Sequence, residues 1–264
     1  MTALNDQALA GKVVLVSGGT QGVGAAAARR ALEAGAEAVM VTGRDVDKGA
    51  VALAALETLR RPVAFHQADV ANVNQAAESV AAVIDRFGRV DCVVNCAGLV
   101  TRGSLIDTSP EHFDAHMAVN LRAPFFIMQA AVRHLLERGA PGSIVNISSI
   151  SSHGAQSFLA PYVAAKAGLN VLTKNAAHAH RFDRIRINAL NIGWTATEGE
   201  DVIQRAAHGA TDGWLERAAV NLPMGSLGQP DQIADMVAFL LSDASGVVTG
   251  AVLDWDQVIV GAWD

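Results

Sequence analysis

The hydrophobic positions of this chain follow two alternating patterns. Short, continuous apolar runs predict buried strands, and the longer segments between them, where apolar residues recur every three to four positions, predict helices. The strands predicted in this way are Val13–Val16, Ala38–Thr42, Val63–His66, Cys92–Asn95, Ser143–Ile147, Arg186–Asn191 and Ala251–Asp254. The predicted helices are Gly24–Glu33, Lys48–Leu59, Ala76–Arg86, Glu111–Glu137, Ala160–His180 and Gln232–Leu241.

Regular alternation of strands and helices is typical of a parallel sheet with helices on both faces. The strands are apolar throughout, as expected when both faces of a sheet are buried. We therefore predict an α/β fold: a single-domain, Rossmann-like, doubly wound parallel sheet of about seven strands that spans residues 1–264. The least regular stretch, about 194–228, is predicted to form a substrate lid, because lids are commonly built from such segments.

The composition argues against several classes of function. Of the 264 residues, 51% are hydrophobic and 17% are charged, so a large core is available. The net charge of -6, without a basic block, argues against a nucleic-acid partner. No apolar run approaches the ~20 residues that cross a bilayer, and residues 1–11 lack a secretory signal, so we expect a cytoplasmic protein with no membrane partner. Cys92 and Cys96 are interpreted as buried, reduced thiols, and no metal site is predicted.

A glycine-rich segment follows the first predicted strand. Ser17–Gly24 contains four glycines in eight residues and leads into an alanine-rich helix. Backbone N–H groups at the start of a helix can hold phosphate, and glycines let the phosphate approach. A tight turn that needs glycine only for backbone freedom is the weaker interpretation, because a strand and a helix flank these glycines. The segment is predicted to cradle the pyrophosphate of a dinucleotide.

Tyr162 is the only tyrosine of the chain, and Lys166 follows it by four residues. Residues four apart on a helix share a face, so the phenol and the ammonium can converge. A nearby positive charge favours phenolate and would bring the phenol pKa, ordinarily about 10, toward neutrality. Ser149 stands thirteen residues before Tyr162, at the end of the apolar run Gly142–Ser149, where a buried strand would emerge.

Together these features resemble the classical short-chain dehydrogenase/reductase family. The resemblance extends roughly from Leu9 to Gly261. The motifs that carry it, in chain order, are Ser17–Gly24, Ala68-Asp69-Val70, Asn95-Cys96-Ala97-Gly98, Asn120, Ser149, Tyr162 with Lys166, and Ile192-Gly193 followed by Thr197.

The resemblance implies an NAD(P)-dependent alcohol dehydrogenase or carbonyl reductase, which transfers hydride between nicotinamide and a secondary alcohol or ketone. It implies that Tyr162 gives a proton to the carbonyl oxygen, or removes it from the hydroxyl, while Ser149 hydrogen-bonds that oxygen. Lys166 is expected to lower the phenol pKa and to bind the nicotinamide ribose. Asn120, within a long predicted helix that also contains Pro124, is expected at a helix distortion and in a water-linked proton path from Lys166.

The same resemblance implies a cofactor site. Asp69 matches the residue that binds adenine, the backbone of Asn95–Gly98 is expected beside the adenosine ribose, and Thr197 is expected to bind the nicotinamide carboxamide. The predicted cofactor residues are Gly18, Thr20, Gln21, Gly22, Val23, Gly24, Arg44, Asp69, Val70, Asn95, Ala97, Gly98, Tyr162, Lys166, Gly193, Thr195 and Thr197.

The choice between NADP(H) and NAD(H) depends on the end of the second strand. Gly43 occupies the place of the acidic residue that favours NAD, and Arg44 follows it, so NADP(H) is favoured through pairing of guanidinium with phosphate. Two residues keep NAD(H) open. Gln21 stands where many NADP-preferring relatives carry a basic residue, and Asp45 could bind a ribose if the register differs by one or two.

The remaining expectations concern the substrate and the assembly. His153, Phe158, Trp194 and Trp214 are candidate pocket residues for a small alcohol or carbonyl substrate, and a sugar or polyol would suit them. Alternatively, the tryptophans pack the lid down and its acids form a solvated surface. The family usually forms homodimers or homotetramers. The alternative function is a catalytically silent protein that binds or senses a dinucleotide, and the intact set of Asn120, Ser149, Tyr162 and Lys166 argues against it.

Overall fold

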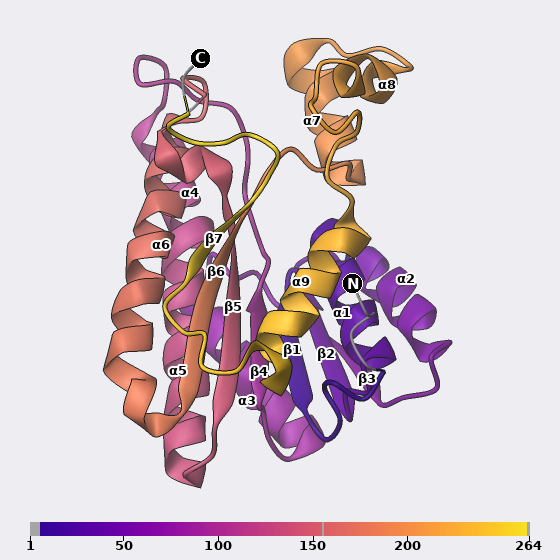
Figure 1. Ribbon diagram of the computed structural model, residues 1–264, viewed down its shortest axis with the longest axis vertical. Coiled ribbons are helices and arrows are strands. Elements are labelled where there is room, and N and C mark those ends of the chain that lie inside the picture. Colours follow the sequence, from indigo (N-terminus) through magenta and orange to yellow (C-terminus); the bar gives the residue numbers. More distant parts are fainter. Residues whose placement is uncertain (1–5, 155, 263–264) are drawn as a thin grey trace.

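The computed structural model describes residues 6–154 and 156–262 and contains one parallel sheet of seven strands in the order β3-β2-β1-β4-β5-β6-β7 (Figure 1). The predicted doubly wound α/β fold is confirmed. The strands are β1 (Val13–Ser17), β2 (Ala38–Gly43), β3 (Val63–Gln67), β4 (Cys92–Asn95), β5 (Gly142–Ser149), β6 (Ile185–Ile192) and β7 (Val252–Trp255).

The helices alternate with these strands. They are α1 (Gly22–Glu33), α2 (Val46–Glu57), α3 (Val73–Phe87), α4 (Pro110–Met117), α5 (Ala123–Arg138), α6 (Ala160–His180), α7 (Glu198–His208), α8 (Trp214–Ala219) and α9 (Pro230–Leu241). The predicted continuous helix over 111–137 is instead two helices, α4 and α5, joined by a π-helical turn at Ala118–Arg122.

Helices α7 and α8 were missed by the hydrophobic pattern. Both lie in the stretch predicted to be irregular, and Figure 1 shows them apart from the helices that flank the sheet. No residue of α7 is buried, and its first turn carries three acids, so the segment resembles a solvated loop even though Val202, Ile203, Ala206 and Ala207 form a short apolar stripe. The base of this segment is fixed by a parallel bridge between Thr195 and Gly228.

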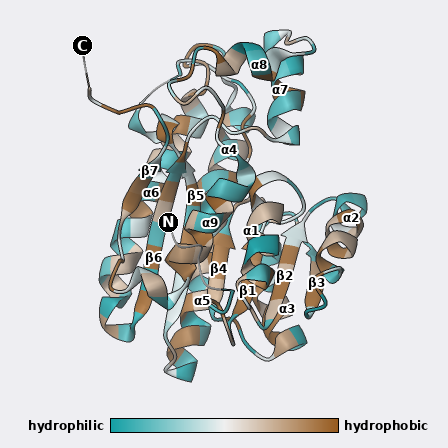
Figure 2. Ribbon diagram, turned by 45° about the vertical axis from the view of Figure 1, so that its right-hand side comes forward, coloured by the Kyte–Doolittle hydropathy of each residue, from teal (hydrophilic) through white to brown (hydrophobic). Residues whose placement is uncertain are grey.

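The core has two halves, one on each face of the sheet. Val14 and Val16 pack with residues of α1 and α9 on one face, whereas Val13 and Leu15 pack with residues of α3 and α5 on the other. Alternate strand residues therefore point to opposite faces, as a β-strand requires. Figure 2 shows the resulting hydrophobic colouring of the central strands. Burial raises the pKa of Cys92 and Cys96 to about 12, as expected for inert thiols.

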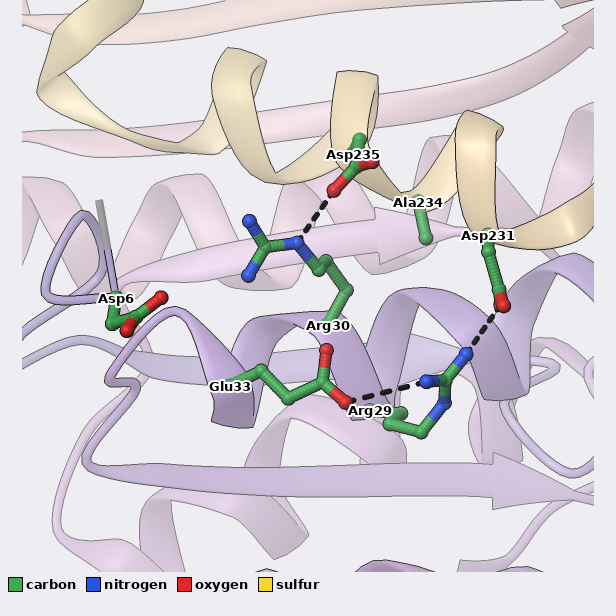
Figure 3. Close-up of a pocket in the computed structure, with 7 residues that line it drawn as sticks. All are labelled: Asp6, Arg29, Arg30, Glu33, Asp231, Ala234 and Asp235. Atoms are coloured by element: carbon green, nitrogen blue, oxygen red, sulfur yellow. Dashed lines mark hydrogen bonds and ion pairs between the residues drawn. The ribbon is translucent and has the colours of Figure 1, made fainter. Parts of the chain in front are cut away.

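Helices α1 and α9 lie side by side and are joined at the surface by ion pairs (Figure 3). Arg30 Nε lies 2.6 Å from Asp235 Oδ1, and Arg29 pairs with both Asp231 and Glu33. These residues line a surface pocket that contains none of the predicted site residues. Among the described helices, none has the length and apolar character needed to cross a membrane.

Candidate active site

The glycine-rich loop lies against the segment that follows β4. A Cβ atom on Gly18 would lie 2.6 Å from Cα of Ala97, and one on Gly24 would overlap the carbonyl oxygen of Gly18. Gly18 and Gly22 also have positive φ angles of 72° and 53°. Only glycine allows this close backbone approach, so the loop has the geometry expected of a phosphate cradle.

The start of α1 is open to an anion. Gln21 occupies the N-cap position but makes no side-chain cap bond, so no side chain caps the first-turn N–H groups of α1. The predicted Thr20 and Val23 flank this position. Thr20 packs beside Gly43, where an added Cβ would meet its side chain, and Val23 is buried in the core. The geometry of the loop and helix is compatible with the pyrophosphate of a dinucleotide.

The segment 194–228, predicted to form a lid, meets the same loop. Thr197 caps α7 by accepting a hydrogen bond from the Glu200 backbone, and its methyl group lies 3.3 Å from the position of a Cβ on Gly22. Thr195 is buried and donates to the carbonyl of Gly193 over 2.9 Å. A Cβ on Gly193 would overlap the carboxylate of Asp256. The structure thus brings Thr197 next to the glycine loop.

Two cations stand near the end of β2. Arg44 is exposed, and Lys48 Nζ donates to Gln21 Oε1 over 2.6 Å. Asp45 is occupied as the N-cap of α2, where it accepts from the Lys48 backbone over 3.0 Å. Lys48 was not among the predicted residues. The sequence could have indicated Lys48, because it lies four residues after Arg44 and in the first turn of the helix that follows the predicted site.

The predicted adenosine-side residues are placed in different ways. Asp69 is exposed just after β3, and its carboxylate accepts from the Ala71 backbone over 3.0 Å, while Val70 is buried.

Asn95, at the end of β4, is buried, and its amide donates to Asn146 over 2.8 Å inside the sheet. The Asn95 side chain is therefore turned into the core. In the segment after β4, the backbone of Ala97 contacts Gly18. A Cβ atom on the next residue, Gly98, would lie 3.6 Å from Asn120 Oδ1.

Ser149, Tyr162 and Lys166 are brought together by β5 and α6. Ser149 ends β5 and lies close enough to the Tyr162 hydroxyl to interact with it. Lys166 Nζ lies 5.8 Å from the centre of the Tyr162 ring and donates to the Ile147 carbonyl over 2.7 Å. Lys166 is buried, and it reaches this carbonyl from the helix that packs on the strand.

The electrostatics differ from the expectation in one respect. The pKa of Tyr162 is raised, chiefly by burial, with a further upward contribution from Glu200. The Ser149 side chain and the charge of Arg102 act in the opposite direction. Burial instead lowers the pKa of Lys166 to about 8. Desolvation disfavours both charged forms, and here it outweighs the attraction that was expected from the ammonium.

Asn120 lies in the π-helical turn, so the predicted helix distortion is confirmed. Its Oδ1 accepts from the Leu99 backbone over 3.0 Å and its Nδ2 donates to the Leu99 carbonyl over 2.8 Å. A residue that the sequence reasoning missed, His116, packs edge-on against the Tyr162 ring and lies 3.2 Å from the Asn120 amide. Burial lowers the pKa of His116 to about 4, so the imidazole is neutral.

The four predicted substrate residues have three different placements. Phe158 and Trp194 are 38% exposed. Trp214 is buried beneath Trp194, with ring centres 5.9 Å apart, and therefore packs the lid. His153 hydrogen-bonds Asp254 over 2.9 Å at the end of β7. Arg102, absent from the prediction, lies 5.4 Å from the centre of the Phe158 ring.

Comparison with known proteins agrees with this fold. A family model described as enoyl-(acyl carrier protein) reductase matches residues 18–257. The chain belongs to the short-chain dehydrogenase/reductase family and is an oxidoreductase of that family.

Similar proteins cover almost the whole chain. L-Rhamnose 1-dehydrogenase (NAD(P)(+)) of Azotobacter vinelandii is 35% identical over 247 residues, which cover 92% of this chain and 94% of the relative. Gluconate 5-dehydrogenase of Gluconobacter oxydans is 34% identical over 245 residues, or 93% of each chain. A crystal structure of actinorhodin polyketide ketoreductase with NADPH superimposes with a TM-score of 0.88 at 29% identity, covering 94% of this chain and 96% of that one.

Proposed function

We propose that this protein is an NAD(P)-dependent dehydrogenase or reductase that interconverts a secondary alcohol and its ketone. The observation that carries the proposal is the convergence of Ser149, Tyr162 and Lys166 at the end of β5, with Asn120 held in the adjacent π-helical turn. The carboxyl ends of parallel strands are where ligands bind in doubly wound sheets.

Each residue has a definite role in this reaction. Tyr162 transfers the proton to or from the substrate oxygen, and the Ser149 hydroxyl donates a hydrogen bond to the same oxygen. Among Asn120, Ser149, Tyr162 and Lys166, the amine of Lys166, with a pKa of about 8, is best placed to exchange protons near neutral pH. Lys166 would also hold the nicotinamide ribose. Asn120 would support the path by which the proton reaches water. The bound dinucleotide supplies or accepts the hydride.

NADP(H) is the proposed cofactor, with NAD(H) as the second candidate. Gly43 leaves no carboxylate at the end of β2, and Arg44 and Lys48 together offer two cations where a 2′-phosphate would be recognised. Asp45, the residue that could have favoured NAD, caps α2 with its carboxylate. The glycine loop would hold the pyrophosphate, and Thr197 would meet the nicotinamide side.

Tyr162→Phe tests the proposal against a silent, dinucleotide-binding role. This variant keeps the ring and removes the hydroxyl, so turnover should be abolished while the dissociation constant for NADP(H) stays within about twofold. Turnover is measured at the reduced-nicotinamide absorbance band with a panel of secondary alcohols and ketones. Retained turnover would exclude Tyr162 as the proton donor. Tight dinucleotide binding by the wild type without turnover on any member would favour the silent role.

The protein is also proposed to assemble as a homodimer or homotetramer. An apolar groove of about 410 Å³ opens between α4, α5 and α6, lined by Met117, Leu121, Arg122, Phe125, Phe126 and Leu172. Light scattering on a size-exclusion column measures the assembly, and a monomer at micromolar concentration would contradict it.

A further inference from the structure

Two opposite charges lie beside Tyr162. Arg102 belongs to the loop after β4, and Glu200 belongs to the first turn of α7. The guanidinium Nη2 lies 3.9 Å from the carboxylate Oε1, and only 17% and 16% of the two side chains are exposed. Thr101, which precedes Arg102, lies 3.0 Å from His116 Nε2, and the His116 ring packs edge-on against the Tyr162 ring. Both charges also act on the pKa of the phenol, in opposite directions.

Contacts of Arg102 and of its neighbour Gly103 fix the position of the guanidinium. The neighbouring Gly103 pairs with the start of α6: its N–H donates to the Phe158 carbonyl over 2.8 Å, and its carbonyl accepts from Ala160 over 2.9 Å. The guanidinium stacks near the Phe158 ring, and its Nε and Nη1 donate over 3.0 Å to His208 and to the Val100 carbonyl. Nη2 makes no hydrogen bond within the described chain, so it remains available as a donor.

The carboxylate of Glu200 is likewise held by neighbouring groups and keeps one oxygen unused. Its Oε1 accepts from Trp194 Nε1 over 2.8 Å and from Gln204 Nε2 over 2.7 Å. Its backbone N–H is held by Thr197 over 3.1 Å. Oε2 accepts no hydrogen bond from any residue that the structure describes. The carboxylate is therefore fixed on one side, with an acceptor left unused on the other.

We propose that Arg102 and Glu200 form a clamp for two neighbouring hydroxyl groups of a neutral, polyhydroxylated substrate, a sugar or a polyol. A guanidinium only donates and a carboxylate only accepts, and at 3.9 Å they do not satisfy each other by a hydrogen bond. Neighbouring hydroxyls can accept from the one and donate to the other. Phe158 and Trp194 provide the apolar walls that accompany such polar groups in ligand sites.

The balance of charge selects the class of substrate. A carboxylate on the substrate would be attracted by Arg102 and repelled by Glu200, and an ammonium group would experience the reverse. A neutral polyol satisfies both side chains without leaving a charge unpaired. This inference rests on the proposed function, because the clamp holds the substrate whose remaining hydroxyl meets Tyr162.

The test compares substrates of equal chain length. Threitol and 2-butanol both have four carbons, and only threitol offers hydroxyls on every carbon. We expect kcat/KM to be at least about tenfold higher for threitol, and we expect Glu200→Gln or Arg102→Gln to reduce this ratio by about tenfold to a hundredfold, the effect of losing a hydrogen bond to a charged group. Arg205→Gln, which breaks an exposed ion pair on the same helix, is the control and should leave the ratio unchanged.

A second readout separates the clamp from general damage to the lid. Glu200→Gln removes a charge that raises the pKa of Tyr162, so the pH profile of alcohol oxidation should move to lower pH, whereas Arg102→Gln should move it to higher pH. Titration of threitol into Tyr162→Phe protein with NADP⁺ measures binding without turnover. Equal affinity for threitol and 2-butanol, or stronger binding of a four-carbon hydroxy acid, would overturn the clamp. Absence of turnover on every alcohol, with clamp-dependent binding retained, would instead count against the proposed reaction.

Discussion

Gly18→Ala should separate the two physical reasons for glycine in the dinucleotide loop. Gly18 has φ of 72°, and a Cβ atom there would lie 2.6 Å from both N and Cα of Ala97. The left-handed conformation costs a non-glycine residue about 1–2 kcal/mol. The overlap involves backbone rather than a flexible side chain, so relief requires a shift of the loop away from β4, and such overpacking adds about 1–3 kcal/mol.

Gly88→Ala is the matched control. Gly88 ends α3 with φ of 81°, and a Cβ there meets no atom within 4 Å. This variant therefore carries the conformational cost without the overlap. Urea unfolding in the absence of dinucleotide should show a loss of about 1–2 kcal/mol for Gly88→Ala and about 2–5 kcal/mol for Gly18→Ala.

Dinucleotide binding provides the functional half of the same experiment. If the loop moves to accommodate the methyl group, Gly18→Ala should weaken NADP(H) binding by about fivefold to a hundredfold, whereas Gly88→Ala should leave it unchanged. Isothermal titration calorimetry measures both variants below their unfolding temperatures. Equal stability losses, together with unaltered affinity in Gly18→Ala, would refute the assignment of this loop as a close-contact phosphate cradle.

Two further predictions concern charged residues. Arg44→Gln combined with Lys48→Gln should lower the ratio of NADP⁺ to NAD⁺ affinity by about tenfold or more, because two cations are removed from the proposed 2′-phosphate site; an unchanged ratio in binding titrations would contradict their role. The pKa of Lys166 falls from 10.5 to about 8 on burial, so between these pH values the unfolded chain binds a proton that the folded chain does not. Wild-type stability should therefore rise with pH relative to Lys166→Met, by about 1.4 kcal/mol per pH unit, and parallel stability curves would contradict the shift.

The fold could be predicted almost entirely from the sequence because both sides of the sheet are covered. Each strand is then apolar throughout, as in Val13–Val16. In the helices that cover the sheet, polar residues recur at a regular spacing. The two helices that escaped prediction, α7 and α8, lie away from this core. Helix α7 buries none of its residues, its apolar stripe is short, and its acidic first turn resembles a solvated loop.

The site was predictable where one motif occupies one stretch of chain, and less so where residues meet across space. Ser149, Tyr162 and Lys166 follow from spacing along β5 and α6, and the distortion at Asn120 was expected. Arg102 and Glu200 are 98 residues apart, and nothing local in either segment indicates that they meet. The raised pKa of Tyr162 could not be predicted either, because it depends on the burial of the phenol, which a sequence does not display.

The buried state of Lys166 itself argues for chemistry rather than packing. In the described part of the chain no ion pair joins this amine to a carboxylate, and its Nζ donates to the Ile147 carbonyl. Burial of an amine without a counter-charge destabilises the folded protein, and an apolar side chain of similar length would fill the space without that penalty. A strongly shifted pKa beside Tyr162, at the end of the sheet where ligands bind, is what a proton-transfer site requires.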